Sequence, residues 1–147
     1  MEFARIAQEL QPRSIAARDW VFQVIRTAII RGVLPGGMPG TLNEEASPVV
    51  QAAIDYCVAN DRWIGAICAA PSILGHKGVL NGKTATCYTG FEKELTGAEI
   101  GSDGVIRDGK IITARGAGVA VDFGLELVGA VCGRETQQQI RGSILCD

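Results

Sequence analysis

The chain has 147 residues, 47% of them hydrophobic and 20% charged, which is enough for one domain with a substantial buried core. A formal net charge of −2 leaves no basic footprint for nucleic acid or an anionic membrane, and no run of about eighteen apolar residues predicts a membrane span. Five cysteines at irregular spacing and a single histidine argue against a metal site and favour a reduced cytoplasmic compartment.

The first 32 residues predict a separate helical segment. Apolar residues recur at helical spacing over 14–31, where Ser14 fits an N-cap and Gly32 fits a stop. A shorter apolar stripe over 3–10 precedes Pro12. We therefore expect a helical hairpin over 1–32, followed by a domain over 33–147.

Strands and helices alternate from Val33 onward, which predicts an α/β protein with a parallel sheet covered on both faces. The expected elements are a strand end and glycine loop over 34–37, a helix from Pro48, a buried strand over 63–68, a helix over 72–76, a strand over 83–88, a helix over 119–131 and a short helix over 135–141. Two helices carry an apolar face, formed by Val50, Ala53, Ile54 and Cys57 in the first and by Val121, Leu125, Val128 and Cys132 in the second.

A hairpin is expected over 105–112, because Asp108-Gly109 stands between alternating apolar residues. We expect a type I′ turn, in which Asp108 and Gly109 both take positive φ.

Cys68 lies in the most informative run of the chain, residues 64–72. An apolar stretch leads into the cysteine, and two alanines and Pro71 follow it, as is typical of a tight strand-to-helix elbow. A thiol at this place would face the positive end of the helix dipole, which favours the thiolate and lowers the pKa. A buried cysteine at the end of a core strand fits the same local sequence.

Four motifs in order, at 33–37, 64–72, 82–88 and 111–118, together resemble the ThiJ/PfpI family. This family includes the parkinsonism-associated deglycase and belongs to the class I glutamine amidotransferase-like superfamily. The resemblance runs from about Val33 to Asp147 and implies a three-layer flavodoxin-like sandwich with a mostly parallel sheet. It also implies a homodimer and a chemistry without a cofactor. The first strands would be missing or replaced here.

The resemblance also implies the site residues. Cys68 takes the place of the family's nucleophile or redox centre, and the backbone N–H groups of Gly37 and Ala69 match its oxyanion donors. Gly36, Cys87 and Arg115 would border the pocket, although the glycines also fit a simple tight turn and Cys87 a buried strand. His76 is expected on the surface of a helix.

The implied activity is cysteine-dependent conversion of small reactive carbonyl compounds such as methylglyoxal, of the glyoxalase or deglycase kind. The alternatives are a non-enzymatic redox sensor or chaperone-like stress protein that oxidises Cys68, and an inactive fragment.

Two departures from the family pattern bear on this activity. Ala69 stands where the protease-like branch has histidine, which argues against a peptidase or amidase. The family's proton-shuttling glutamate has no counterpart, because Glu2 and Glu9 lie in a context that matches nothing in the family. We therefore expect that a frameshift, a wrong start site or a gene fusion replaced the first thirty-odd residues.

Overall fold

The computed structural model describes residues 37–146, so Gly36 and the helical hairpin expected over 1–32 lie outside the described residues. The chain divides into two compact units, Met1–Gln51 and Ala52–Asp147. Within residues 37–146, no helix is both long and apolar enough to cross a membrane.

The described part of the first unit contains a turn, a short helix and the start of a second helix. Gly37 has a φ of +73°, and its carbonyl accepts a hydrogen bond from the Thr41 N–H at 3.0 Å, at the start of α3 (Gly40–Glu45). Helix α4 (Pro48–Ala59) begins at Pro48, as predicted, and continues into the second unit. The Ser47 hydroxyl accepts a hydrogen bond from the Val50 N–H at 3.5 Å, in the position of an N-cap.

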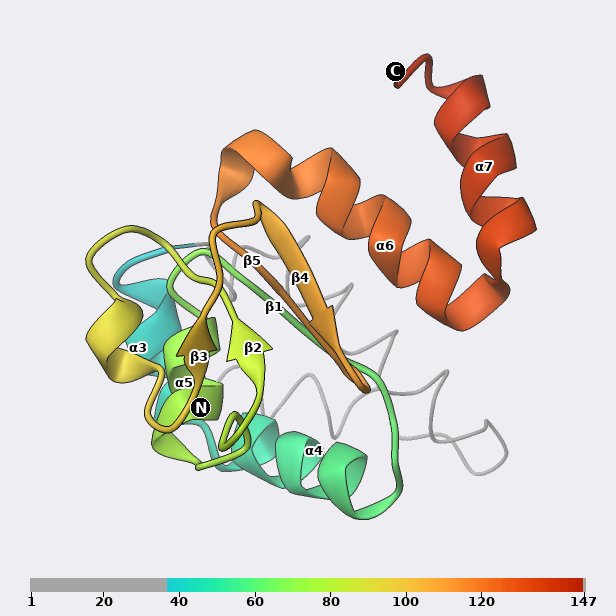
Figure 1. Cartoon of the computed structure of the whole chain (residues 1–147). Helices are drawn as coiled ribbons and strands as arrows, with labels where there is room; N and C mark the ends of the chain where they lie inside the picture. Colours follow the sequence, from blue (N-terminus) through green and yellow to red (C-terminus); the bar gives the residue numbers. More distant parts are fainter. Residues whose placement is uncertain (1–36, 147) are drawn as a thin grey trace. The chain divides into compact units, whose positions relative to one another are not determined.

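The second unit is built on a three-stranded sheet in the order β1–β5–β4 (Figure 1). Strand β1 (Ile64–Ile67) runs parallel to β5 (Ile111–Ala114), with Ile64 opposite Ile111. Strand β4 (Val105–Asp108) runs antiparallel to β5. All four residues of β5 are buried, which is the pattern of a central strand covered on both faces.

Helix α6 (Ala120–Cys132) packs directly on this sheet, as Figure 1 shows, after the single turn η2 (Ala117–Val119). A Cβ at Gly65 in β1 would lie 2.9 Å from Leu127 Cδ2 and 3.1 Å from Phe123 Cζ, so glycine lets these two side chains of α6 lie close to the strand. Helix α7 (Arg134–Ser143) then packs on α6, and Arg141 Nη2 lies 3.0 Å from Asp122 Oδ1.

The apolar face predicted for α6 is only partly correct. Leu125 is 3% exposed, but Val121 is 51% exposed and Cys132 is also exposed. Thirteen helical residues span about 20 Å, whereas a four-residue strand spans about 13 Å. The sheet therefore covers the middle of α6 and leaves both ends uncovered.

The hairpin is confirmed, but the expected turn type is wrong. Asp108 pairs with Ile111, so the loop residues are Gly109 and Lys110. Gly109 has a φ of +60°, whereas Asp108 is not among the residues with positive φ. A glycine with positive φ at the first loop position fits a type II′ turn. Asp108 stays in its strand because its carboxylate accepts a hydrogen bond from the Thr84 N–H at 2.9 Å and lies 3.6 Å from Lys83 Nζ.

A second, two-stranded parallel sheet is formed by β2 (Thr84–Ala85) and β3 (Glu99–Ile100). The strand expected over 83–88 is thus only two residues long. Residues 86–88 leave the ladder because their backbone groups find other partners: the Thr86 N–H donates to Thr113 Oγ1 at 3.0 Å, and the Tyr88 N–H donates to the Cys68 carbonyl at 2.8 Å. In the chain, β2 is followed by the short 3-10 helix η1 (Glu92–Glu94) before β3 begins. This turn packs on α5 (Pro71–His76).

Candidate active site

The strand-to-helix elbow expected around Cys68 is present. The Cys68 N–H donates to the Ala114 carbonyl at 2.9 Å, which extends the pairing of β1 with β5 by one residue. Three residues later, Pro71 begins α5. Cys68 itself has a φ of +65°, a left-handed conformation that costs a residue with a side chain about 1–3 kcal/mol. Strain of this size at a thiol marks the elbow as a candidate functional site.

Ala69 follows the strained cysteine and is 2% exposed. Its carbonyl accepts hydrogen bonds from Ser72 Oγ at 2.7 Å and from the Ser72 N–H at 3.1 Å. Within the described part of the chain, the Ala69 N–H donates no hydrogen bond. Because a buried N–H without a partner is costly, this donor is suited to an oxygen that a bound substrate would bring.

Cys87 lies beside the elbow, because the N–H of the next residue, Tyr88, donates to the carbonyl of Cys68. Cys87 is 5% exposed. Burial, and then electrostatic interactions with Glu92 and Cys68, raise its pKa to about 11. Cys87 therefore carries its proton at neutral pH. The hydrogen bond from Tyr88 to Cys68 also places the segment of Cys87 next to the carboxyl ends of β1 and β5. In α/β folds, ligand sites usually lie at this edge of the sheet.

Glu92 is a neighbour of this cluster that the sequence did not indicate. It is exposed in η1, and its Oε2 accepts a hydrogen bond from the Gly90 N–H at 2.8 Å. Its charge raises the pKa of Cys87. No sequence motif predicts the path of this loop, and the segment 91–95 carries no sequence signal of function.

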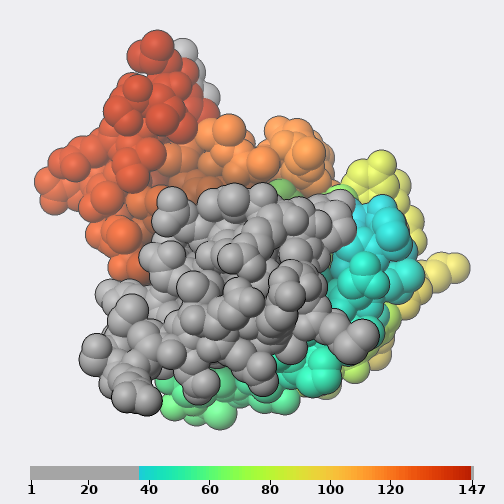
Figure 2. All heavy atoms as spheres, turned by 180° about the vertical axis from the view of Figure 1, so that it is seen from behind, coloured from blue at the N-terminus to red at the C-terminus, as the bar shows by residue number. Residues whose placement is uncertain are grey.

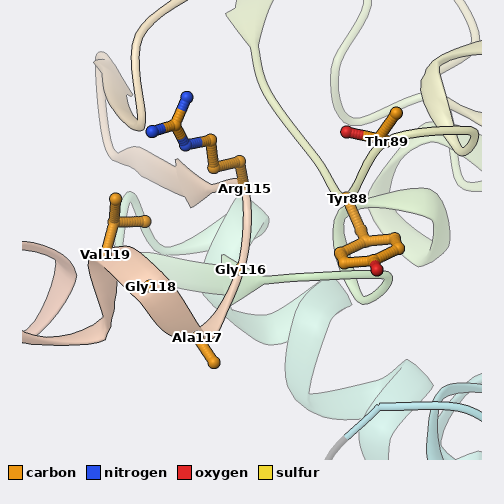
Figure 3. Close-up of a pocket in the computed structure, with 7 residues that line it drawn as sticks. All are labelled: Tyr88, Thr89, Arg115, Gly116, Ala117, Gly118 and Val119. Carbon is orange, nitrogen blue, oxygen red and sulfur yellow. The ribbon is translucent and has the colours of Figure 1, made fainter.

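An open cavity of about 370 Å³ borders the elbow. It is lined by Tyr88, Thr89, Arg115, Gly116, Ala117, Gly118 and Val119. Figure 3 shows Arg115 and Val119 on one wall and Tyr88 and Thr89 on the other. Cys68 is not among the lining residues, but its backbone is hydrogen-bonded to Tyr88, which lines one wall, and to Ala114, which precedes Arg115 of the other.

The structure brings together three of the predicted site residues, Cys68, Ala69 and Cys87, and places Arg115 on the wall of the adjoining cavity. Gly37 belongs to the first compact unit, so its role as a second oxyanion donor stays a prediction. Gly36 lies outside the described residues. Over residues 37–146, no group of three or more His, Cys, Asp or Glu side chains is arranged to hold a metal ion.

The single histidine and the remaining cysteines lie away from this cluster. His76 is exposed at the end of α5, as expected, and its Nε2 lies 2.8 Å from Glu94 Oε2. Burial raises the pKa of Cys57 on α4, and the nearby Arg62 opposes this effect. Cys132 is exposed at the end of α6, and Cys146 Sγ lies 3.8 Å from Arg141 Nη1.

Comparison with known proteins gives a consistent result. The model of the DJ-1/PfpI family matches residues 28–130. Protein dj-1beta of Drosophila melanogaster is 33% identical over 115 residues, which make up 77% of this chain and 62% of the fly protein. The crystal structure of Drosophila DJ-1beta matches with a TM-score of 0.70 at 31% identity over the same shares of both chains. The structure of oxidized Toxoplasma gondii DJ-1 matches with a TM-score of 0.71 at 31% identity, covering 76% of this chain and 61% of that one.

Two relatives have names that state an activity. The glutathione-independent glyoxalase DJR-1.2 of Caenorhabditis elegans is 31% identical over 105 residues, or 70% of this chain and 55% of the worm protein. The isonitrile hydratase of Pseudomonas putida is 33% identical over 114 residues, or 74% of this chain and 48% of that enzyme. This chain thus spans about three-fifths or less of these relatives. The fold is the α/β flavodoxin-like fold of its structural neighbours, and the chain belongs to the DJ-1/PfpI family.

Proposed function

We propose that the chain uses the Cys68 thiol as a nucleophile in a cofactor-free, stress-related reaction on small carbonyl compounds. The observation that carries this proposal is the strained elbow, with φ of +65° at Cys68 and a buried Ala69 N–H that has no partner among the described residues. The glyoxalase among the relatives supports the choice of a carbonyl substrate.

The proposed reaction converts methylglyoxal and water into lactate. The Cys68 thiolate adds to the aldehyde carbon, and the Ala69 N–H donates to the oxygen that becomes negatively charged, with the Gly37 N–H as the second predicted donor. A proton then moves from the aldehyde carbon to the neighbouring carbon, which leaves a thioester on Cys68. Water hydrolyses this thioester and frees the thiol. The steps balance without an external oxidant or reductant.

The test is to measure lactate formed from methylglyoxal by the full chain, its Cys68→Ser variant and a Cys132→Ser control. We expect Cys68→Ser to abolish lactate formation and Cys132→Ser to leave it unchanged, because Cys132 is exposed at the far end of α6. Equal lactate formation by wild type and Cys68→Ser would contradict the proposal.

The second candidate is a redox sensor or chaperone-like stress protein that works through oxidation of Cys68. The structural relative solved in an oxidized form supports this alternative. Absence of lactate formation, combined with selective oxidation of Cys68 by mild peroxide, would favour the sensor over the enzyme.

We also propose that the chain forms a homodimer, as the family resemblance implies. Exposed apolar side chains on the two C-terminal helices support an interface there: Val131 is 63% exposed and Ile144 is 51% exposed. These helices form a prominent lobe of the second unit (Figure 2). Sedimentation velocity should give the mass of two chains, and Val131→Asp should shift the equilibrium toward the single chain. A single-chain mass at high protein concentration would contradict the dimer.

A further inference from the structure

The starting observation is that the candidate nucleophile has a second thiol as a neighbour. The carbonyl of Cys68 and the N–H that follows Cys87 form a hydrogen bond of 2.8 Å, so the α-carbons of the two cysteines flank this bond. A disulfide spans about 4.4–6.8 Å between α-carbons, a separation that two residues flanking one backbone hydrogen bond can meet. Both cysteines are free thiols in the structure.

We propose that Cys68 and Cys87 are a redox pair, in which peroxide oxidises Cys68 and Cys87 then closes a reversible intramolecular disulfide with it. Cys68 is only partly buried, whereas Cys87 is 5% exposed, so a peroxide in solvent reaches Cys68 first. The more buried Cys87 is then the thiol that attacks the oxidised sulfur in this proposal.

The chemistry balances in two steps. The Cys68 thiolate attacks a peroxide oxygen, the O–O bond breaks, and the products are the sulfenic acid of Cys68 and an alcohol or water. The Cys87 sulfur then attacks the Cys68 sulfur, the S–O bond breaks, and the proton of Cys87 leaves with the oxygen as water. A dithiol reductant reopens the disulfide and is itself oxidised.

The other cysteines are poor partners for this step. Cys132 is exposed at the end of α6, and Cys146 lies beside Arg141 after α7. Cys57 belongs to α4, where burial raises its pKa. Among the cysteines of residues 37–146, only Cys87 directly precedes a residue, Tyr88, whose N–H bonds to the carbonyl of Cys68. The pair therefore involves Cys68 and Cys87 specifically.

The closing step should be slow at neutral pH and accelerate as the solution becomes alkaline. A thiol with a pKa of about 11 is almost entirely protonated at pH 7, and its thiolate fraction rises about tenfold per pH unit below the pKa. Because the thiolate is the attacking species, the rate of disulfide closure should rise by up to about tenfold per unit between pH 7 and 9. Glu92→Gln should accelerate closure at fixed pH, since the Glu92 charge raises the pKa of Cys87.

The experiment exposes the full chain to limiting hydrogen peroxide, blocks free thiols and maps the peptides by mass spectrometry without reduction. The variants are Cys87→Ala, Cys87→Ser and the control Cys132→Ser, and thermal unfolding confirms that each is folded. We expect a Cys68–Cys87 peptide, removable by dithiothreitol, in wild type and Cys132→Ser. Both Cys87 variants should instead convert Cys68 to sulfinic acid at least about tenfold faster, because nothing intercepts the sulfenic acid.

Two results would overturn the redox pair. One is a disulfide that joins Cys68 to Cys132, Cys146 or a second chain. The other is sulfinic acid formation at Cys68 that is equally fast in wild type and in the folded Cys87 variants. The inference rests on the reactivity of Cys68, which the proposed function shares, but its readout is a covalent bond and not carbonyl turnover. The disulfide can therefore form even if no lactate is produced, and lactate can be produced even if no disulfide forms.

Discussion

Cys68 combines a side chain with a backbone conformation that normally belongs to glycine. Its φ of +65° lies in the left-handed region, and the surrounding hydrogen bonds to Ala114 and Tyr88 hold it there. Strain of this kind persists only where neighbouring contacts enforce it, and it often accompanies function. The chain thus accepts a local cost in free energy at the residue that presents the thiol.

A comparison of two substitutions measures this cost. Cys68→Gly and Cys68→Ala both remove the thiol, but only glycine relieves the left-handed strain. We expect the glycine variant to unfold with a free energy about 1 kcal/mol higher than the alanine variant, measured by urea denaturation. This order is the reverse of the usual one, in which alanine is favoured through the entropy of the unfolded chain. An alanine variant as stable as the glycine variant would show that the elbow is relaxed.

Cys87 should make the fold sensitive to alkaline pH. Its pKa is about 11 in the folded chain against 9.0 as the ordinary value, so folding favours the protonated thiol. This contribution is fully present below pH 9 and is lost as the pH rises through 11. We expect wild type to lose up to about 2 kcal/mol of stability between pH 9 and 11, measured by urea denaturation at each pH. Cys87→Ala should lack this loss, apart from changes common to all other titrating groups.

At the scale of elements, the β4–β5 hairpin depends on the glycine at its tip. Gly109 has positive φ, and replacement by alanine or valine forces a side chain into that conformation. We expect Gly109→Val to lower the free energy of unfolding by about 1 kcal/mol or more. Gly124→Ala is the matched control, because Gly124 lies inside α6 with open space around its Cα. This control should raise stability by about 0.5–1 kcal/mol. An unchanged denaturation midpoint in Gly109→Val would contradict the hairpin geometry.

The elements that the sequence predicted best are those with a strong local signal. Pro48 and Pro71 mark helix starts that the structure confirms, and the Asp-Gly pattern correctly indicated a hairpin. The errors arose where a distant partner decided the outcome. The carboxylate of Asp108 bonds to Thr84 and moves the turn by one residue, and the Thr113 hydroxyl draws Thr86 out of its expected strand.

The candidate site shows the same division. The run around Cys68 predicted the elbow, because small residues and a proline are local features. No local feature indicates that the Ala69 N–H has no partner within residues 37–146 or that Glu92 acts on Cys87, since both depend on how loops far apart in the chain pack together.

At the scale of the whole molecule, carbonyl turnover should be weak compared with that of a glyoxalase relative. Within residues 37–146, no carboxylate forms a hydrogen bond with Cys68, and Glu2 and Glu9 lie outside the described residues. Loss of a positioned acid–base group costs about 10²–10⁴ in rate. We therefore expect methylglyoxal turnover lower by that factor than in an intact glyoxalase relative, measured at neutral pH with Cys68→Ser as the baseline. Equal turnover would show that a carboxylate from the first 36 residues serves the site.

The parallel pairing of β1 with β5 has a consequence for synthesis on the ribosome. Ile64 and its partner Ile111 are separated by about fifty residues, so β1 leaves the ribosome well before the strand that it pairs with. At about 5–20 residues per second, β1 waits roughly 2–10 seconds for β5. The β4–β5 hairpin has no such delay, because its two strands are joined by two residues. Compared with the β4–β5 hairpin, β1, the strand that leads into Cys68, is therefore open to chaperones and to aggregation for longer.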